Sequence, residues 1–435
     1  MAHSDKRELV LGIAGLGTVG AGVVKILTGH ADLIAARAGC PVRIKAVSAR
    51  DRSRDRGVDL SAYDWYDNAA DMVEDDEINL IVELIGGSDG PALKLSQAAL
   101  ERGKGFVTAN KALIATHGKA LAITAEEQGA ALRFEAAVAG GIPIIKALGE
   151  GLAANEIIGV RGILNGTCNY ILTRMENEGL DFSEVLADAQ RLGYAEADPT
   201  FDIDGIDTAH KTAILAAMAF GKEPNIQNLP TEGIRTIAPV DIEYARELGY
   251  RIKLLGVAQR TKEGIETRVH PAMVPISAPL AGVMDATNAV MVEGDFVGQT
   301  VYVGAGAGEG PTASAVVADI IDVARCGNSC PAFGVAPATL EPYVPVPVER
   351  HQGTYYIRLR VDDRHGVMAD ITAALAEEQV SIESMLQRGR ATEGGVYIVL
   401  TTHLTAEAAI SATLNRFTKL ECVLETPTML RIEAF

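Results

Sequence analysis

The sequence predicts an α/β protein in which a parallel-sheet domain is followed by an α+β domain and a small β-α-β module. Three observations lead to this fold class. Strand-like and helix-like segments alternate in the first third of the chain, longer amphipathic segments follow, and five prolines precede the last part. At roughly 150 residues per domain, a chain of 435 residues is expected to form about three domains.

The first third indicates one parallel sheet. Short apolar runs at 9–14, 42–49, 79–85 and 105–108 indicate buried strands, and helical periodicity lies between them at 18–38, 91–102 and 111–128. Strands that alternate with helices form parallel sheets with right-handed crossovers. Residues 1–135 are therefore expected to form this domain.

The middle of the chain indicates an α+β domain over residues 136–304. Amphipathic segments at 182–192 and 207–220 precede strand-like stretches at 264–270 and 299–303. Five prolines (Pro331, Pro337, Pro342, Pro345 and Pro347) then predict a stiff, extended linker over 331–350. In the last part, residues 351–435, strand patterns at 355–361 and 395–403 and a helical pattern at 367–379 indicate a compact module.

Composition excludes several classes of function. The net charge is −18, so no nucleic acid and no anionic membrane is expected as a partner, because both need a basic surface. The longest apolar runs are short, and no transmembrane helix is predicted. Five scattered cysteines, an odd number, fit the reducing cytoplasm better than a disulfide framework.

A glycine-rich turn follows the first strand and opens a helix. It reads GxGxxG and consists of Gly15, Leu16, Gly17, Thr18, Val19 and Gly20. In this context the first glycine allows the tight turn, the second admits a pyrophosphate, and the third permits close helix packing. The motif predicts a Rossmann-type dinucleotide site, with the helix N-terminus facing the anion.

The end of the second strand favours NADP, with NAD as the alternative. Sites for NAD usually carry Asp or Glu here, whereas this chain has Ser48 and Arg50. Six basic residues lie between positions 43 and 56, and such a patch would hold a 2′-phosphate. A solvated loop with salt partners is the simpler interpretation.

Two lysines and an aspartate are the candidate reactive groups. Lys111 follows the fourth strand, at the sheet edge where ligands of open α/β sheets bind. Asp207 and Lys211 lie one helical turn apart, after a loop rich in carboxylates. As a purely structural alternative, Asp207 is a charge at a helix start and Lys211 is its ion-pair partner.

Four motifs resemble those of homoserine dehydrogenases. They are GLGTVG (15–20), TANKALIA (108–115), GILNGTCNYI (162–171) and GYAEADPTFDIDGIDTAHK (193–211), and the resemblance covers about 9–324. Enzymes of this family reduce L-aspartate 4-semialdehyde to L-homoserine with NAD(P)H, on the route to threonine, isoleucine and methionine.

The resemblance implies a role for each matching residue. Lys211 would be the general acid/base, and Lys111 would lie at the reacting oxygen. Glu196 and Asp207 would bind the substrate, with Asp202 beside them. Asp207 would alternatively orient Lys211, and the sequence does not separate these roles. A lysine with a lowered pKa suits the protonation of a developing alkoxide.

The resemblance also implies a monovalent cation and a split first domain. The Glu135 carboxylate and the carbonyls of Val138, Gly140 and Ile142 would be ligands for Na⁺, although a glycine hinge is the simpler interpretation. The loop at 304–312 would return the chain to the cofactor at Gly310, so that about 305–330 completes the first domain.

The module after the linker resembles an ACT domain, a ferredoxin-like β-α-β-β-α-β sensor of amino acids. His365 stands where proline is common in the turn that enters the first helix. The amides of Gly366 and Val367 would hold an effector carboxylate, and Asp363 would bind its ammonium or cap the helix. L-Threonine is the expected effector. Because such pockets lie between paired modules, the resemblance also implies a homodimer or homotetramer.

Two rival functions are weighed against this one. Another dehydrogenase of amino-acid metabolism with an ACT tail does not account for the GYAEADP…DTAHK stretch. A regulator that binds NADP without turnover does not account for the intact Lys111, Glu196, Asp207 and Lys211. We therefore expect an NADP-preferring homoserine dehydrogenase, feedback-regulated by threonine.

Overall fold

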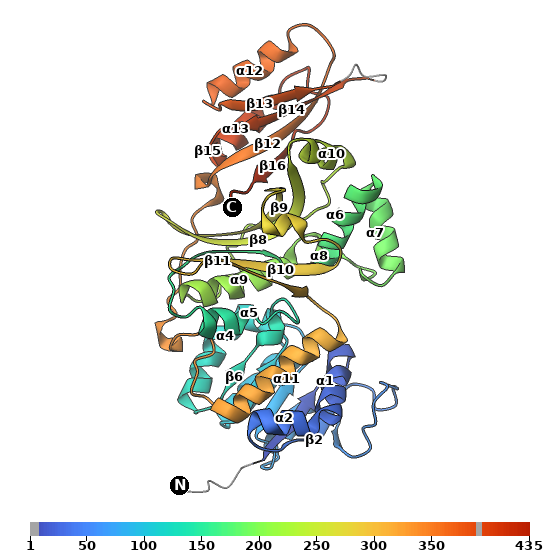
Figure 1. Ribbon diagram of the computed structural model, residues 1–435, viewed down its shortest axis with the longest axis vertical. Coiled ribbons are helices and arrows are strands. Elements are labelled where there is room, and N and C mark those ends of the chain that lie inside the picture. The colour runs from blue at the N-terminus through green and yellow to red at the C-terminus, as the bar shows by residue number, and fades with distance from the viewer. Residues whose placement is uncertain (1–7, 389–393) are drawn as a thin grey trace. The chain divides into compact units, whose positions relative to one another are not determined.

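The computed structural model describes residues 8–388 and 394–435, which divide into two compact units. The first unit contains residues 8–166, 207–229 and 287–344. The second contains 167–206, 230–286 and the described part of 345–435. Each unit is therefore assembled from three stretches of chain that are far apart in the sequence, as the colours of Figure 1 show.

A six-stranded parallel sheet forms the centre of one part of the first unit. Its order is β3-β2-β1-β4-β5-β6, with strands β1 (Leu9–Ala14), β2 (Val42–Ser48), β3 (Asp64–Tyr66), β4 (Leu80–Glu83), β5 (Gly105–Thr108) and β6 (Leu132–Arg133). All its described pairings are parallel. The central strands are almost wholly apolar because helices cover both faces of such a sheet.

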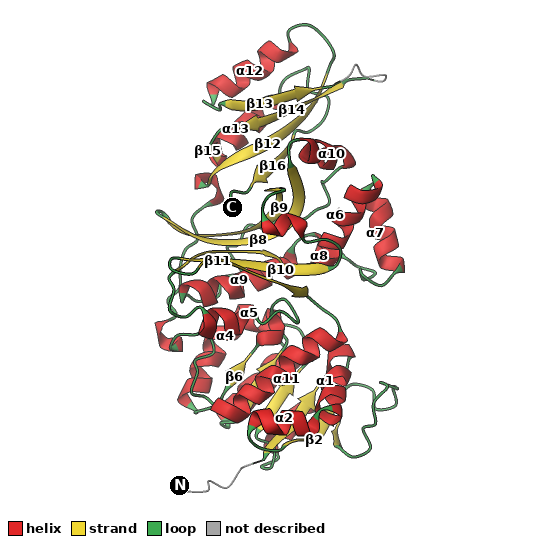
Figure 2. Ribbon diagram, viewed as in Figure 1, coloured by secondary structure: helices red, strands yellow, loops and turns green. Residues whose placement is uncertain are grey.

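The helices of this sheet are α1 (Thr18–Gly29), α2 (Ala31–Ala38), α3 (Pro91–Glu101) and α4 (Lys111–Glu127) (Figure 2). The helical periodicity over 18–38 corresponds to two helices, α1 and α2, because the chain bends by 84° at His30. Gly29 ends α1, and glycine has low helical propensity. Among the described residues, no single helix is long and apolar enough to cross a membrane.

A helix from late in the sequence, α11 (Glu309–Cys326), packs on α1. A Cβ on Gly22 would lie 2.8 Å from the Glu309 side chain, and Lys25 forms an ion pair with Glu309 at 2.6 Å. Val316 and Ile320 of α11 belong to the same apolar core as the strands. Residues after 308 thus complete the packing of the parallel-sheet part.

The rest of the first unit carries three antiparallel strands, β7 (Ile157–Ile163), β10 (Thr287–Gly294) and β11 (Gly298–Ala305), with helix α9 (Ile206–Phe220). The first half of the proline-rich segment also packs here. Phe333 is fully buried, 5.0 Å from the ring of Phe134, and Leu340 is buried. One turn of 3-10 helix, Pro337–Thr339, lies within this segment, and its apolar side chains pack it against the unit.

The second unit contains a sheet with the order β8-β9-β16-β12-β14-β13. Its strands are β8 (Tyr250–Thr261), β9 (Gly264–Pro275), β12 (Gln352–Val361), β13 (Ile382–Gln387), β14 (Val396–Thr402) and β16 (Thr428–Ile432). The pairings are antiparallel except that between β9 and β16. Helices α6 (Gly166–Glu178), α7 (Phe182–Arg191), α8 (Thr200–Ile203) and α10 (Pro239–Glu247) precede or connect the first strands.

The C-terminal module has the predicted β-α-β-β-α-β order. Strand β12 leads to α12 (Val367–Glu377), β13 and β14 to α13 (Glu407–Phe417), and β16 returns beside β12. A core of its own, which includes Tyr355, Ile371 and Phe417, lies between this sheet and the two helices. The fold class predicted for the whole chain is therefore confirmed.

The last strand joins this module to the neighbouring strands of the same unit. Arg431 and Ile432 of β16 pair with Ala272 and Met273 of β9 in parallel, while the other edge of β16 pairs with β12. The proline-rich segment predicted a module set apart from the preceding strands. This pairing could not be predicted, because strand order is a long-range property that a local pattern does not contain.

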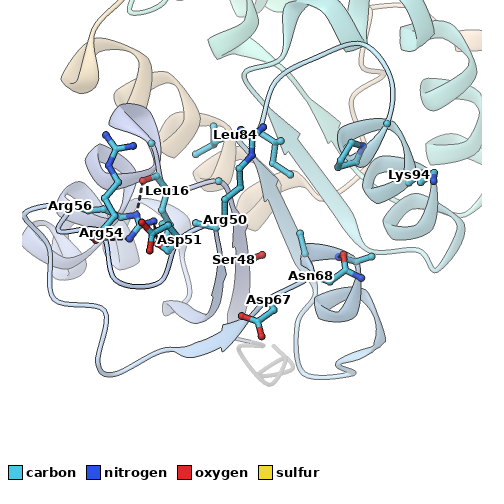
Figure 3. A pocket seen from close by; sticks show the side chains of 18 residues that line it. Leu16, Ser48, Arg50, Asp51, Arg54, Arg56, Asp67, Asn68, Leu84 and Lys94 are labelled. Atoms are coloured by element: carbon cyan, nitrogen blue, oxygen red, sulfur yellow. Dashed lines mark hydrogen bonds between the residues drawn. The ribbon is translucent and has the colours of Figure 1, made fainter.

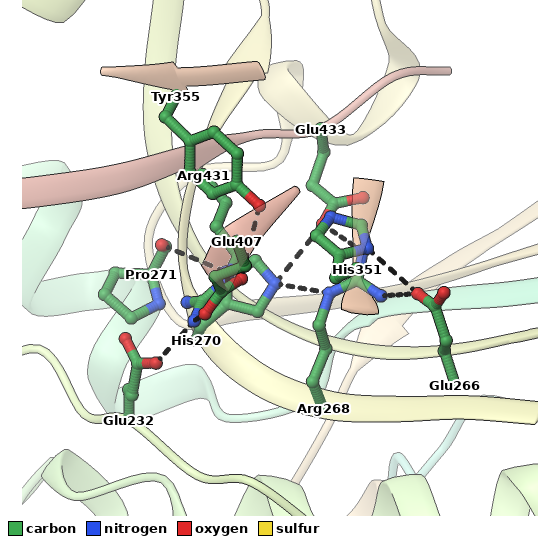
Figure 4. Close-up of polar contacts among 10 residues, drawn as sticks. All are labelled: Glu232, Glu266, Arg268, His270, Pro271, His351, Tyr355, Glu407, Arg431 and Glu433. Carbon is green, nitrogen blue, oxygen red and sulfur yellow. Dashed lines mark hydrogen bonds and ion pairs between the residues drawn. The ribbon is translucent and has the colours of Figure 1, made fainter. Parts of the chain in front are cut away.

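Buried ion pairs also lie where the C-terminal module meets β9 (Figure 4). Arg431 binds Glu407 of α13 and also Glu232, to which it donates at 2.8 Å. Arg268 of β9 donates to Glu433 at 2.7 Å. Since a buried charge is stable only when paired, each of these residues requires its partner at the junction.

Candidate active site and cofactor pocket

A pocket of about 780 Å³ lies at the carboxyl ends of the strands β1, β2 and β4 (Figure 3). The order of the parallel strands reverses between β1 and β4, and ligands of open α/β sheets bind outside such a point. The pocket is lined by the glycine turn, the end of β2, the 67–70 stretch and the segment between β4 and α3.

The three glycines of the turn have different surroundings. Gly15 has φ +103°, and a Cβ there would lie 2.5 Å from the Leu84 carbonyl oxygen. A Cβ on Gly20 would lie 2.1 Å from the Gly15 carbonyl oxygen. A Cβ on Gly17 meets no other described atom within 4 Å, so its backbone is open to the pocket. This cradle fits a pyrophosphate that accepts from backbone amides.

The basic stretch after β2 divides into residues that line the pocket and residues that do not. Arg50, Arg54 and Arg56 line it. By contrast, Arg43 pairs with Glu8, and Lys45 pairs with Asp75 at 2.8 Å. For these last two, the simpler interpretation of salt-paired residues holds.

Lys94 adds a fourth cation to the lining, which also contains the carboxylates of Asp51 and Asp67. Lys94, in the first turn of α3, was not expected from the sequence, because no motif surrounds it. Arg56 donates to the carbonyl of Leu16 at 3.0 Å and so fastens the basic loop to the glycine turn. Ser48 lines the pocket and is 5% exposed.

The remaining predicted cofactor residues lie around the start of two helices. Thr18 and Val19 begin α1 directly after its N-cap, Gly17. Gly310 lies in the first turn of α11, and a Cβ there meets no other described atom within 4 Å. The structure therefore leaves these backbones approachable, with the positive ends of the helix dipoles beside them.

A buried carboxylate shared by two lysines is the chemical centre of the first unit. Lys111 Nζ lies 2.6 Å from Asp207 Oδ1, and Lys211 Nζ lies 2.7 Å from Asp207 Oδ2. Asp207 is 3% exposed, whereas the Lys111 side chain is 31% exposed. The structure thus brings together three residues singled out in the sequence, which lie on α4 and α9.

Main-chain and amide groups hold this cluster. Asn165 donates to Asp207 Oδ2 at 2.9 Å, and Lys211 donates to the carbonyl of Leu164 at 2.7 Å. The side-chain amide of Asn288, from β10, donates to the same Leu164 carbonyl at 2.9 Å. Asn165 stands in a motif quoted above, but sequence reasoning gave it no role and missed Asn288 altogether, since only tertiary contact brings it here.

The electrostatics keep Asp207 ionised. Burial by itself would raise the pKa of its carboxyl, but the charges of Lys211 and Lys111 and their hydrogen bonds outweigh burial and hold this pKa well below its usual range. Asp207 is therefore a carboxylate at neutral pH. It compensates the positive charge of two neighbouring ammonium groups.

Glu196 and Asp202 belong to the second unit. Glu196 is exposed in the loop after α7, where Gln190 donates to its backbone carbonyl at 3.0 Å. Asp202 is in α8 and is partly buried, and its backbone carbonyl accepts from the Cys168 thiol. The loop that carries both residues is thus braced by α7 and α6.

Glu135 is held in an unusual environment. Its carboxylate accepts the amides of Ile145 and Lys146, both at 2.9 Å. Burial, and next the charge of Asp319, raise its pKa to about 7. The turn with the predicted carbonyl ligands Val138, Gly140 and Ile142 follows directly and is buried. Gly140 has φ +52°, and a Cβ there would lie 2.5 Å from Gly306, so glycine is required.

The predicted effector turn lies at the start of α12. Gly366 is the N-cap, in the left-handed conformation at φ +92°, and no side chain caps the helix there. Val367 is buried as the first helical residue, and Asp363 is exposed in the preceding turn. The Asp363 side chain therefore does not cap α12, and the alternative that it serves as a helix cap was wrong.

Three family models match the chain. "Homoserine dehydrogenase, NAD binding domain" matches residues 15–135, "Homoserine dehydrogenase" matches 143–321, and "ACT domain" matches 355–422. The residues that line the cofactor pocket fall within the first match, and the Lys111–Asp207–Lys211 cluster combines residues of the first and second. The third match covers most of the C-terminal module.

Full-length relatives agree with these matches. The homoserine dehydrogenases of Neisseria gonorrhoeae and Pseudomonas aeruginosa are each 45% identical and cover 98% of this chain and 98% and 99% of their own lengths. A crystal structure of a homoserine dehydrogenase from Thiobacillus denitrificans is 46% identical, with a TM-score of 0.92 and 98% coverage of both chains.

Two glycine substitutions should separate packing from cofactor binding. Gly20→Ala should lower the melting temperature, because its Cβ collides with a backbone carbonyl. Gly17→Ala should leave the melting temperature within about 2 °C but raise the KM for the dinucleotide about tenfold or more, because its methyl group enters the pocket. Calorimetry and steady-state kinetics of both variants check this; equal melting temperatures for the two would contradict it.

Proposed function

Because the chain belongs to the homoserine dehydrogenase family, we propose that Lys111, Asp207 and Lys211 perform the proton chemistry of L-aspartate 4-semialdehyde reduction. The observation that carries this proposal is the buried Asp207 carboxylate, which two lysines share at 2.6 and 2.7 Å. The enzyme is an NAD(P)-dependent oxidoreductase.

The chemistry requires a proton donor at the carbonyl oxygen. When bound, the nicotinamide cofactor supplies a hydride to the aldehyde carbon, and negative charge develops on oxygen. In our proposal Lys211 gives a proton to that oxygen, and Lys111 stabilises the charge with its ammonium group. In the reverse direction, Lys211 would accept the hydroxyl proton of homoserine.

We assign Asp207 to orienting the lysines. Its Oδ1 accepts from Lys111, while its Oδ2 accepts from Lys211 and Asn165. With both oxygens engaged, the group is better suited to hold two ammonium groups than to bind a third, from the substrate. We therefore propose Glu196 and Asp202 as the partners of the substrate's ammonium group, because a carboxylate accepts hydrogen bonds from an ammonium group.

Replacing Lys211 tests the central proposal. Lys211→Ala should lower kcat by about 100-fold or more, the usual scale for removal of a general acid. The measurement is oxidation of NADPH with aspartate semialdehyde. Lys222→Ala is the matched control, because Lys222 pairs with Glu341 at the surface of the same unit and should leave kcat unchanged. Turnover of Lys211→Ala near that of the wild type would refute the assignment.

We propose that the cofactor is NADP in preference to NAD. The support is the lining of the pocket by Ser48, Arg50, Arg54, Arg56 and Lys94, which supplies cations for a 2′-phosphate. A hyperthermophilic archaeal homoserine dehydrogenase solved in complex with NADPH is 26% identical, with a TM-score of 0.61 over 72% of this chain.

Arg50 provides the test of cofactor preference. Arg50→Ala should raise the KM for NADPH about tenfold, since a charged hydrogen bond to phosphate is lost, and should leave the KM for NADH almost unchanged. Arg52→Ala is the control, because Arg52 lies over the Trp65 ring and does not line the pocket. Equal effects of Arg50→Ala on both cofactors would exclude a role in phosphate recognition.

We further propose that Na⁺ binds at Glu135 and the carbonyls of Val138, Gly140 and Ile142. The buried carboxyl of Glu135, with its pKa raised to about 7, would be stabilised in its ionised form by a neighbouring cation. Titration of the metal-free enzyme with NaCl, against choline chloride, should raise the melting temperature; identical curves would count against the site.

Feedback regulation by L-threonine, on the route to threonine, isoleucine and methionine, is the expected role of the ACT module. An effector carboxylate would accept from the amides of Gly366 and Val367, with Asp363 at its ammonium. Strand β16 and the Arg431 ion pairs to Glu407 and Glu232 support a mechanical connection from this module to β9. Regulation requires that the effector binds the active and inactive states with different affinity.

The regulatory proposal is tested on the full chain. Threonine at millimolar concentration should lower the rate of the wild type, and Arg431→Met should weaken that response, because it removes a buried contact of β16. Arg416→Met, at an exposed ion pair with Glu378 of the same module, should respond as the wild type does. A rate that is insensitive to threonine in the wild type would remove the support for a sensor.

We also propose that the enzyme is a homodimer or homotetramer. The support is the exposed apolar side chains of Ile158 on β7, Phe296 in the connection between β10 and β11, and Val301 and Val303 on β11. Light scattering of Val303→Asp against the wild type checks this, with a smaller mass expected for the variant. A cytoplasmic location stays a prediction from the cysteine content.

A further inference from the structure

We propose that Glu83 is a positioning residue that connects the rim of the cofactor pocket to Lys111. This inference rests on the proposed function, because it assigns to Glu83 an effect on the lysine that acts at the reacting oxygen. Glu83 is the last residue of β4 and is fully buried, and it does not line the pocket. Its effect on the reaction would therefore be indirect.

One carboxylate oxygen of Glu83 holds the pocket rim. Glu83 Oε1 accepts the backbone amides of Ile85 at 2.6 Å and Gly86 at 2.9 Å. Leu84 and Ile85 line the pocket, and the Leu84 carbonyl lies against Gly15, where a Cβ would be 2.5 Å away. This rim and the glycine turn thus pack against each other at the pocket.

The other carboxylate oxygen of Glu83, Oε2, is connected to the start of the Lys111 helix by hydrogen bonds through Thr108. Strands β4 and β5 pair in a register that puts Thr108 beside Glu83, and the Thr108 hydroxyl donates to Glu83 Oε2 at 2.5 Å. The same hydroxyl accepts the amide of Asn110 at 2.9 Å. Thr108 therefore transmits the position of Glu83 to the residue just before Lys111.

Asn110 fixes the start of the helix that carries the lysine. Its Oδ1 caps α4 by accepting the amide of Leu113 at 3.1 Å, and its Nδ2 donates to the Gly87 carbonyl at 2.6 Å. Lys111 is the first residue of α4 and reaches Asp207. Gly87 directly follows Ile85 and Gly86, whose amides donate to Glu83, so the series of hydrogen bonds returns to the segment in which it begins.

A carboxylate suits this position for a chemical reason. The three groups that face Glu83 are donors, two amides and a hydroxyl, and a carboxylate is a pure acceptor with two oxygens. A displacement of about 1 Å at a catalytic group costs up to about 100-fold in rate. Glu83 thus sets the distance between the cofactor rim and the ammonium of Lys111.

The test removes the hydrogen bond from Thr108 to Glu83 and leaves the bonds from the amides of Ile85 and Gly86 to Glu83 in place. Thr108→Val deletes the hydroxyl with little change of shape. We expect kcat to fall about tenfold, while the KM for NADPH changes by less than about twofold. Thr108→Ser keeps the hydroxyl and should restore kcat. Glu83→Gln offers Thr108 a donor instead of an acceptor and should also lower kcat.

A matched control and a double variant make the outcome decisive. Thr413→Val makes the same substitution at a fully buried hydroxyl in α13, which donates within its own helix, and should not alter kcat. In the Lys111→Ala background, Thr108→Val should cause no further loss, because the residue that it positions is gone.

Two results would overturn the inference. One is an equal fall in kcat from Thr108→Val with and without Lys111, and the other is a Thr108→Ser variant as slow as Thr108→Val. Should Lys111→Ala alone keep full activity, the assignment of Lys111 in the proposed function fails. That failure is seen in the single variant and is thus distinguishable from failure of the positioning role.

Discussion

The shared carboxylate of Asp207 is the contact on which the arrangement of the first unit depends. Moving a carboxylate out of water is costly, and two ammonium groups with an amide offset that cost only if they approach closely. Because Asp207 needs these close contacts, α4 and α9 must pack beside each other and beside the turn at Leu164 and Asn165. Two lysines that come from distant segments are thereby held at one point, with their charges balanced.

The parallel sheet provides the second constraint. The carboxyl ends of β1, β2, β4 and β5 meet at one edge, so the glycine turn, Ser48, Glu83 and Thr108 are neighbours although other segments separate them in sequence. The cofactor pocket and the start of α4 are built on that edge. Glu83 uses the adjacency of β4 and β5 to bind both with a single side chain.

The C-terminal strand connects the ACT module to the strands that precede it in the same unit. Strand β16 is the fourth strand of a β-α-β-β-α-β fold and also the parallel partner of β9. The ACT family match ends at 422, before this strand begins, yet Arg431 and Glu433 carry the buried ion pairs of the junction. A force on the module would thus reach β9 through backbone hydrogen bonds and buried charges, both of which are sensitive to small displacements.

The fold class, the β-α-β-β-α-β module, the family and the pairing of Asp207 with Lys211 could be predicted from the sequence. Apolar runs, glycine spacing and residues one helical turn apart are local features, and local sterics act on them directly. Three features came only from the packing of the folded chain: the contacts of Lys111 and Asn165 with Asp207, the ion pairs of Arg43 and Lys45 outside the pocket, and the pairing of β16 with β9. The tertiary structure likewise revealed Lys94, Asn288 and Glu83. These contacts depend on strand order and register, which follow from how the whole core packs and not from the spacing of neighbours along the chain.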